Sequence, residues 1–117
     1  MKTTFVIISV SDRVDSLNEL IESIARNSRF KDYDINLLYQ DYLGNKDAIK
    51  YKGVYKNIFI YPKKLGCHGA RVTLLRKIWQ DYDVFINLDD DILLTEYTDY
   101  TLAIEKALEP STGFVLT

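Results

Sequence analysis

Short apolar runs recur along the chain, and their composition predicts β-strands. Four runs are rich in β-branched or aromatic residues and too short for helices: Thr4–Val10, Ile35–Tyr39, Asn57–Tyr61 and Val84–Leu88. A weaker fifth run covers Phe114–Thr117. None of the runs alternates cleanly between apolar and polar residues, a pattern typical of strands that are buried on both faces of a parallel sheet.

Between these runs, apolar residues repeat every three or four positions, as they do on one face of a helix. Ser16 and Glu19 have the spacing of a capping box. Trp79 falls on an apolar stripe, so we expect it in the core. A short helix within Lys46–Tyr51 is a weaker candidate. The three stronger predicted helices cover Val14–Ile24, Val72–Trp79 and Leu102–Leu108, the last followed by Pro110.

Strands that alternate with helices predict an α/β fold, a doubly wound and mostly parallel sheet with helices on both faces. The 117 residues have the length of one domain, so we expect residues 1–117 to form a single domain. Ligands of such sheets bind outside the carboxyl ends of the strands, near the point where the strand order reverses. The candidate loops are therefore 9–13, 40–45, 63–71 and 89–91.

Three consecutive aspartates, Asp89, Asp90 and Asp91, follow the fourth apolar run. Adjacent carboxylates repel one another, and a hard divalent cation such as Mn²⁺ or Mg²⁺ cancels that repulsion through oxygen ligands. The carboxylates are too few to saturate the ion, so waters and a substrate's phosphates would complete its shell. The alternative interpretation is a solvated acidic turn.

The loop 63–71 combines glycines with positive charge ahead of a predicted helix. Backbone N–H groups at such a turn can approach an anion. Arg71, expected in the first helical turn, can form paired hydrogen bonds to a phosphate. The alternative is that the glycines serve a steric need and that Lys63 and Lys64 face water. We expect Arg13 to be a solvated residue at the start of a helix.

Asp12 and Asp41 each have two interpretations. Asp12 is suited to capping the first predicted helix, and Asp41 to stabilising a turn. The functional alternative for both is a hydrogen bond to the base or the ribose of a nucleotide.

Composition and charge exclude several classes of function. With 15 basic and 17 acidic residues, the net charge of −2 argues against a duplex nucleic acid or an anionic membrane as partner. One cysteine and one histidine cannot form an internal disulfide or a Cys/His zinc site. No run approaches the roughly 20 apolar residues of a membrane span. The first residues lack the pattern of a signal peptide, so we expect a cytoplasmic protein.

Taken together, the loops resemble a known family. The strand followed by Ser11-Asp12-Arg13, the segment Leu65–Arg71 that ends in Ala-Arg, and the strand Phe85–Asp91 that leads into an acidic motif follow one another in order. In this respect the chain is similar to the N-terminal, nucleotide-sugar-binding half of GT-A glycosyltransferases of the family 2 type. The resemblance implies a Rossmann-like fold and a DXD-type motif.

The resemblance also implies roles for particular residues. Asp89 would contact the ribose, and Asp91, with Asp89 or Asp90, would hold Mn²⁺ or Mg²⁺ on the diphosphate. Arg71 would lie near the base or the phosphates. Ser11, Asp12 and Asp41 would meet the base. The expected partner is a nucleoside-diphosphate sugar, with a UDP-sugar as first choice.

The family's acceptor-binding half and the catalytic base of its inverting members would lie beyond Thr117. The chain is therefore expected to lack the acceptor-binding half, and no catalytic residue is assigned. Exposed sheet edge and apolar surface would favour self-association. Two other hypotheses remain open: a non-catalytic nucleotide-sugar-binding or interaction module of the same fold, and a phosphoacceptor signalling domain. The latter would place its acidic residues after the first strand instead of the fourth.

Overall fold

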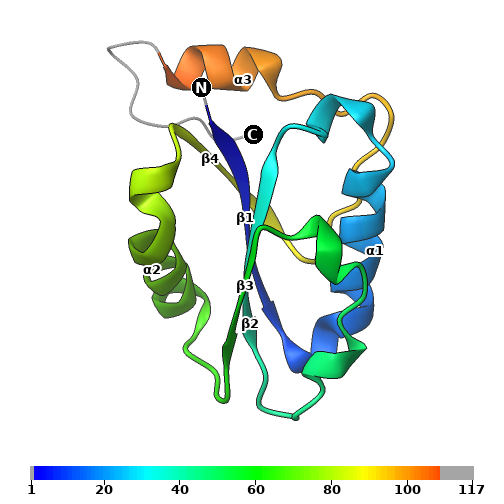
Figure 1. Cartoon of the computed structure of the whole chain (residues 1–117), viewed down its shortest axis with the longest axis vertical. Coiled ribbons are helices and arrows are strands. Elements are labelled where there is room, and N and C mark those ends of the chain that lie inside the picture. Colours follow the sequence, from blue (N-terminus) through cyan, green and yellow to red (C-terminus); the bar gives the residue numbers. More distant parts are fainter. Residues whose placement is uncertain (1, 109–117) are drawn as a thin grey trace.

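A four-stranded parallel sheet forms the centre of the protein (Figure 1), whose structure, a computed structural model, describes residues 2–108. The strand order is β3-β2-β1-β4, and every neighbouring pair is parallel. All four stronger strand predictions are confirmed to within one residue at each end. The fifth apolar run and Pro110 lie outside the described residues. The strands are β1 (Thr3–Val10), β2 (Asp34–Gln40), β3 (Asn57–Tyr61) and β4 (Val84–Asp89).

Helices cover both faces of the sheet. Helix α1 (Val14–Ala25) connects β1 to β2 on one face, and α2 (Cys67–Ile78) connects β3 to β4 on the other (Figure 1). Helix α3 (Thr101–Ala107) lies near the amino end of β1. This arrangement confirms the predicted doubly wound, Rossmann-like α/β fold.

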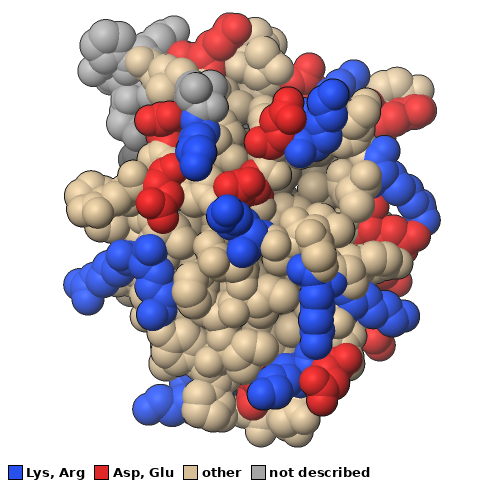
Figure 2. All heavy atoms as spheres, viewed as in Figure 1, with Lys and Arg blue, Asp and Glu red and all other residues tan. Residues whose placement is uncertain are grey.

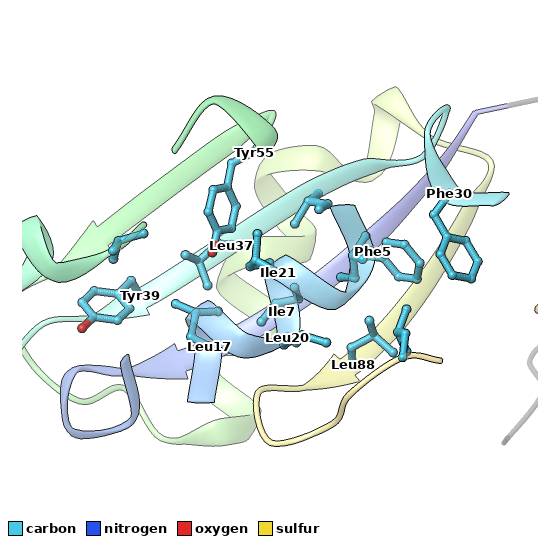
Figure 3. Packing of buried hydrophobic residues seen from close by; sticks show 14 residues of the cluster. Phe5, Ile7, Leu17, Leu20, Ile21, Phe30, Leu37, Tyr39, Tyr55 and Leu88 are labelled. Atoms are coloured by element: carbon cyan, nitrogen blue, oxygen red, sulfur yellow. The ribbon is translucent and has the colours of Figure 1, made fainter. Parts of the chain in front are cut away.

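The apolar core has two parts, one on each side of the sheet. Phe5 and Ile7 of β1 pack with Leu20 on the α1 side (Figure 3), whereas Val6 packs with Leu74 on the α2 side. Successive side chains of a strand point to opposite faces, and here both faces are covered. The continuous apolar run of β1 follows from this burial on both sides.

The short helix predicted within Lys46–Tyr51 is present as a three-residue 3₁₀ helix, Lys46–Ala48. Two other local predictions were wrong. Ser16 does not cap the helix, because α1 begins at Val14 and its N-cap residue has no side-chain cap. Trp79 is 58% exposed, because α2 ends at Ile78 and the following 3₁₀ turn takes the indole off the apolar stripe.

The topology also positions the candidate site. The chain moves from β1 outward to β2 and β3 and then returns to add β4 on the other side of β1. The strand order therefore reverses between β1 and β4. Ile8 pairs with Asp89 in the register of these two strands, so Ser9 and Asp90 follow at the same edge of the sheet.

Charged side chains are mixed over the surface. Figure 2 shows basic and acidic residues side by side on the face viewed in Figure 1, and neither kind gathers into a broad patch there. This face therefore offers no broad basic surface of the kind that nucleic acid requires. Within residues 2–108, no helix has the length and apolar character needed to cross a bilayer.

Candidate functional site

An open cavity of about 430 Å³ lies at the carboxyl ends of β1 and β4 and beside the start of α2. This is the switch point at which ligands bind in open α/β sheets. The cavity brings together residues of all four candidate loops, although loop 40–45 contributes only Gln40, the last residue of β2. Its lining consists of Ile8, Ser9, Val10, Arg13, Gln40, Lys64, Gly66, Cys67, Arg71, Asp89, Asp90 and Asp91.

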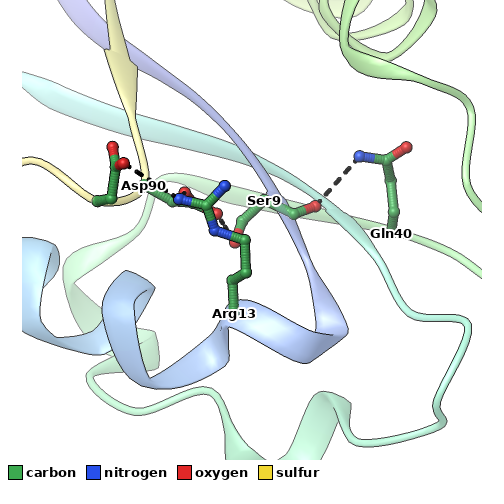
Figure 4. Close-up of polar contacts among 5 residues, drawn as sticks. Ser9, Arg13, Gln40 and Asp90 are labelled. Carbon is green, nitrogen blue, oxygen red and sulfur yellow. Dashed lines mark hydrogen bonds and ion pairs between the residues drawn. The ribbon is translucent and has the colours of Figure 1, made fainter.

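The three aspartates have different environments. Asp89 ends β4 and is exposed, and the Asp91 side chain is 62% exposed. Asp90 is buried, and both of its carboxylate oxygens already have partners (Figure 4). The Ser9 hydroxyl donates to Oδ2 over 2.7 Å, and Nη2 of Arg13 lies 2.7 Å from Oδ1. Asp89 and Asp91 are thus the carboxylates that remain open to a ligand.

Competing effects act on the pKa of Asp90. Burial raises this pKa above its usual range, while the hydrogen bond from Ser9 and the charge of Arg13 oppose the rise. The neighbouring carboxylates of Asp91 and Asp89 raise it further. The contacts with Ser9 and Arg13 therefore offset part of the cost of burying a charged group.

Arg13 is part of the site. The prediction of a solvated residue at the start of a helix is confirmed, since Arg13 is exposed and directly precedes α1, but its contacts with the aspartates were not predicted. Its guanidinium lies between two aspartates, because the same Nη2 atom that contacts Asp90 is 3.4 Å from Oδ2 of Asp91. The side chain is 45% exposed, so it is held at the rim of the cavity. The short 3₁₀ turn Ser11–Arg13, between β1 and α1, brings it there.

Gln40 connects the end of β1 to the glycine-containing loop. Its Nε2 donates to the carbonyl of Ser9 over 3.3 Å (Figure 4), and its Oε1 accepts from the backbone N–H of Leu65 over 2.6 Å. Gly66 follows with φ 79° and ψ 157° and serves as the N-cap residue of α2. The buried amide of Gln40 therefore fixes the loop that begins α2.

Arg71 lines the same cavity from α2. It lies in the second turn of the helix, and the prediction of the first turn was wrong because α2 begins at Cys67. Its buried Nε has no hydrogen-bond partner among the described residues. Lys64 also lines the cavity, with its ammonium group 4.6 Å from the centre of the Tyr42 ring.

Ser11, Asp12 and Asp41 are not among the residues that line the cavity. The Ser11 hydroxyl accepts from the N–H of Leu43, and Asp41 accepts from the N–H groups of Asn45 and Lys46 over 2.8 and 3.1 Å. Asp41 thus stabilises a turn, which was one of its two interpretations.

The exposed Asp12 belongs to the 3₁₀ turn and is not the N-cap residue of α1. For Ser11, Asp12 and Asp41 alike, contact with a base remains a prediction.

Metal ligation also remains a prediction. No group of three or more His, Cys, Asp or Glu side chains converges as a set of metal ligands anywhere in residues 2–108. The sequence predicts only a partial ligand set, to be completed by waters and phosphates, and the exposed carboxylates of Asp89 and Asp91 correspond to that set.

Sequence reasoning included Ser9 and Gln40 in the candidate loops 9–13 and 40–45 but assigned neither of them a role. Both are polar residues at or directly after the end of a predicted strand. A polar residue at the carboxyl end of an otherwise apolar strand was the signal that could have identified them. Both are now seen to join the loops around the cavity.

Comparison with solved structures confirms the fold. The chain is similar to the crystal structure of S. aureus TarS 1-349, with a TM-score of 0.57 and 16% sequence identity. The match covers 92% of this chain and 32% of the TarS chain, so the protein spans about a third of that structure. This likeness is one of fold, a Rossmann-like α/β arrangement that is GT-A-like. No family model matches the chain, and no curated protein sequence matches it.

Proposed function

We propose that the protein is a donor-binding GT-A-like domain that binds a nucleoside-diphosphate sugar, in the first place a UDP-sugar, together with Mn²⁺ or Mg²⁺. One observation carries the proposal. A single cavity at the switch point is lined by two exposed carboxylates, Asp89 and Asp91, and by Arg71. Carboxylates suit the metal and a guanidinium suits phosphate, so the cavity offers both halves of a site for a metal-bound diphosphate.

The donor set fits a hard divalent cation. Asp89 and Asp91 supply oxygen ligands at an exposed position, and such a cation often combines one or two carboxylates with substrate phosphates. The guanidinium of Arg13 already lies at Asp90 and Asp91, so this turn accommodates a positive charge. The buried Nε of Arg71, another residue of the cavity lining, has no hydrogen-bond partner among the described residues.

Each residue has a defined task in this proposal. Asp91, with Asp89, would hold the cation, whose charge would stabilise the diphosphate that leaves when the sugar is transferred. Asp89 would also contact the ribose, and Arg71 would donate to the phosphates or the base. Asp90 would position the turn through Ser9 and Arg13, to which it is already bound.

The base would lie on the side of the Asp41 turn, near Ser11 and Asp12. The proposal concerns donor binding and assigns no residue as catalytic base.

Calorimetric titration of the full chain with UDP, in the presence and absence of Mn²⁺, tests this function. We expect Mn²⁺ to strengthen UDP binding, and Asp91→Asn to weaken the Mn²⁺-dependent binding by about tenfold or more, since even residues that only support metal ligands are worth this much. Asp32→Asn is the matched control, because Asp32 is exposed in the turn before β2 and the variant changes the net charge equally. A UDP affinity that is the same with and without Mn²⁺, or no UDP binding, would contradict the proposal.

The same samples distinguish a transferase domain from a non-catalytic module of the same fold. Slow release of sugar from a bound UDP-sugar, dependent on Asp91, would indicate that the chain supports turnover. Tight binding of the UDP-sugar without hydrolysis or transfer would assign the non-catalytic module instead.

A further inference from the structure

Arg13 makes two contacts of unequal character in the acidic turn. Its Nη2 is 2.7 Å from an oxygen of Asp90, whose side chain is 6% exposed, and 3.4 Å from an oxygen of Asp91, whose side chain is 62% exposed. A charge-assisted contact of 2.7 Å at a buried carboxylate is strong. A longer contact at an exposed carboxylate is weak and screened by solvent. The guanidinium is therefore anchored by Asp90, and its contact with Asp91 is the replaceable one.

Asp90 is in turn held from the other side. The buried Ser9 hydroxyl donates to its second oxygen, so both oxygens of this buried carboxylate already have a partner within the chain. The middle aspartate thus differs in function from its neighbours: it fixes the place of Arg13 and leaves Asp89 and Asp91 exposed.

We propose that Arg13 is a positioning residue that serves as the built-in counter-ion of Asp91, so that a divalent cation binds Asp91 only by displacing the guanidinium from it. The proposal rests on the proposed function, because it concerns the cation site assigned there. It goes beyond that function by naming the group that opposes the cation and by predicting how the cation and the nucleotide depend on each other.

The physical basis is competition for one carboxylate. Two cations at the same oxygen repel each other. A divalent ion that binds Asp91 must therefore break the contact between Arg13 and Asp91. It is also repelled by the Arg13 guanidinium, which Asp90 holds nearby. The cation alone should therefore bind weakly. A diphosphate brings negative charge that both cations can share, so its arrival should relieve this repulsion and favour the cation.

The test measures Mn²⁺ binding to the full chain without nucleotide, by loss of the electron paramagnetic resonance signal of free Mn²⁺. We expect Arg13→Gln to bind Mn²⁺ about fivefold or more tightly than the wild type, because it removes one positive charge a few ångströms from the ion. Arg26→Gln is the control. Arg26 is an exposed residue of another part of the surface, paired with Glu22, and its loss changes the net charge equally.

Two further variants test whether the gain in Mn²⁺ affinity arises at Asp91. If it does, Arg13→Gln should give no gain in a chain that already carries Asp91→Asn, so that the double variant binds Mn²⁺ no better than Asp91→Asn alone. Arg13→Lys keeps the charge and should remain close to the wild type. A damaged fold would not give a gain in metal affinity that depends on Asp91, so this readout separates positioning from a structural role, and circular dichroism verifies that each variant is folded.

Equal Mn²⁺ affinity of the Arg13→Gln and Arg26→Gln chains, or a gain that persists in the double variant, would overturn the inference while leaving Asp91-dependent UDP binding intact. A gain that depends on Asp91 in a chain that does not bind UDP would support the inference and contradict the proposed function. Absence of nucleotide-free Mn²⁺ binding in every variant, Arg13→Gln included, would overturn the inference, whereas the proposed function is decided by the UDP titration.

Discussion

Two buried tyrosines show how the same side chain can have opposite effects on stability. Burial raises the pKa of Tyr39 to about 12, and it also raises the pKa of Tyr55. The hydroxyl of Tyr39 donates to Oδ1 of Asn45 over 2.7 Å. The buried hydroxyl of Tyr55 has no hydrogen-bond partner in the part of the chain that the structure describes. An unpaired buried hydroxyl costs free energy, whereas a paired one is close to neutral or favourable.

Tyr55→Phe should therefore raise the free energy of unfolding by about 1 kcal/mol, because it removes an unpaired polar group and retains the ring. Tyr39→Phe should lower it by about 1 kcal/mol, because it leaves Asn45 without its donor. Urea unfolding followed by circular dichroism measures both. A loss of stability in Tyr55→Phe as large as that in Tyr39→Phe would show that the Tyr55 hydroxyl has a partner.

At this scale the sequence pointed to several residues of the cavity but not to their contacts. Asp89, Asp91 and Arg71 line the cavity, and each was a candidate because it follows a strand or lies near the start of a helix. The environment of Asp90 could not be predicted, since its burial depends on Ser9 and Arg13, which are about 80 residues away along the chain. Contacts of such separation leave no local pattern.

At the scale of elements, the glycine-containing loop depends on one backbone conformation. Gly66 has φ 79° and ψ 157°, a region that residues with a Cβ avoid at a cost of about 1–3 kcal/mol. A Cβ at this position would meet nothing within 4 Å, so the cost of a substitution comes from the backbone and not from a clash.

Gly66→Ala should lower the free energy of unfolding by about 1–3 kcal/mol and weaken UDP binding, because the loop would leave the position fixed by Gln40. Gly53→Ala is the matched control, since Gly53 also has open space around it and its φ is outside the left-handed region. It should change stability by less than about 0.5 kcal/mol. Equal effects of the two substitutions on unfolding and on UDP titration would contradict the role assigned to Gly66.

The strands and α1 were predictable because buried faces require apolar residues, and the spacing of apolar residues is visible in the local sequence. The four apolar runs mark strands with covered faces, and the stripe from Val14 matches α1. The errors fall at element ends. Trp79 continues the stripe of α2 in the sequence, but the helix ends one residue earlier. Helix ends depend on tertiary contacts that a periodic pattern does not contain.

At the scale of the whole molecule, the order of the strands explains why the charged loops meet. β4 returns to the side of β1 opposite to β2, so that the loops after β1 and β4 and the start of α2 surround one cavity. The sequence predicted the class of fold but not this order. Several orders of four parallel strands satisfy the same pattern of helices and strands, and the choice among them depends on packing across the sheet.

The cation site can be tested in crystals of the full chain grown with UDP and Mn²⁺, by anomalous diffraction at the manganese absorption edge. We expect one anomalous peak in contact with a carboxylate oxygen of Asp91 and with the diphosphate, while Asp90 keeps its contact with Ser9. A diphosphate bound elsewhere, or a manganese peak away from Asp91 with UDP in the cavity, would contradict this expectation.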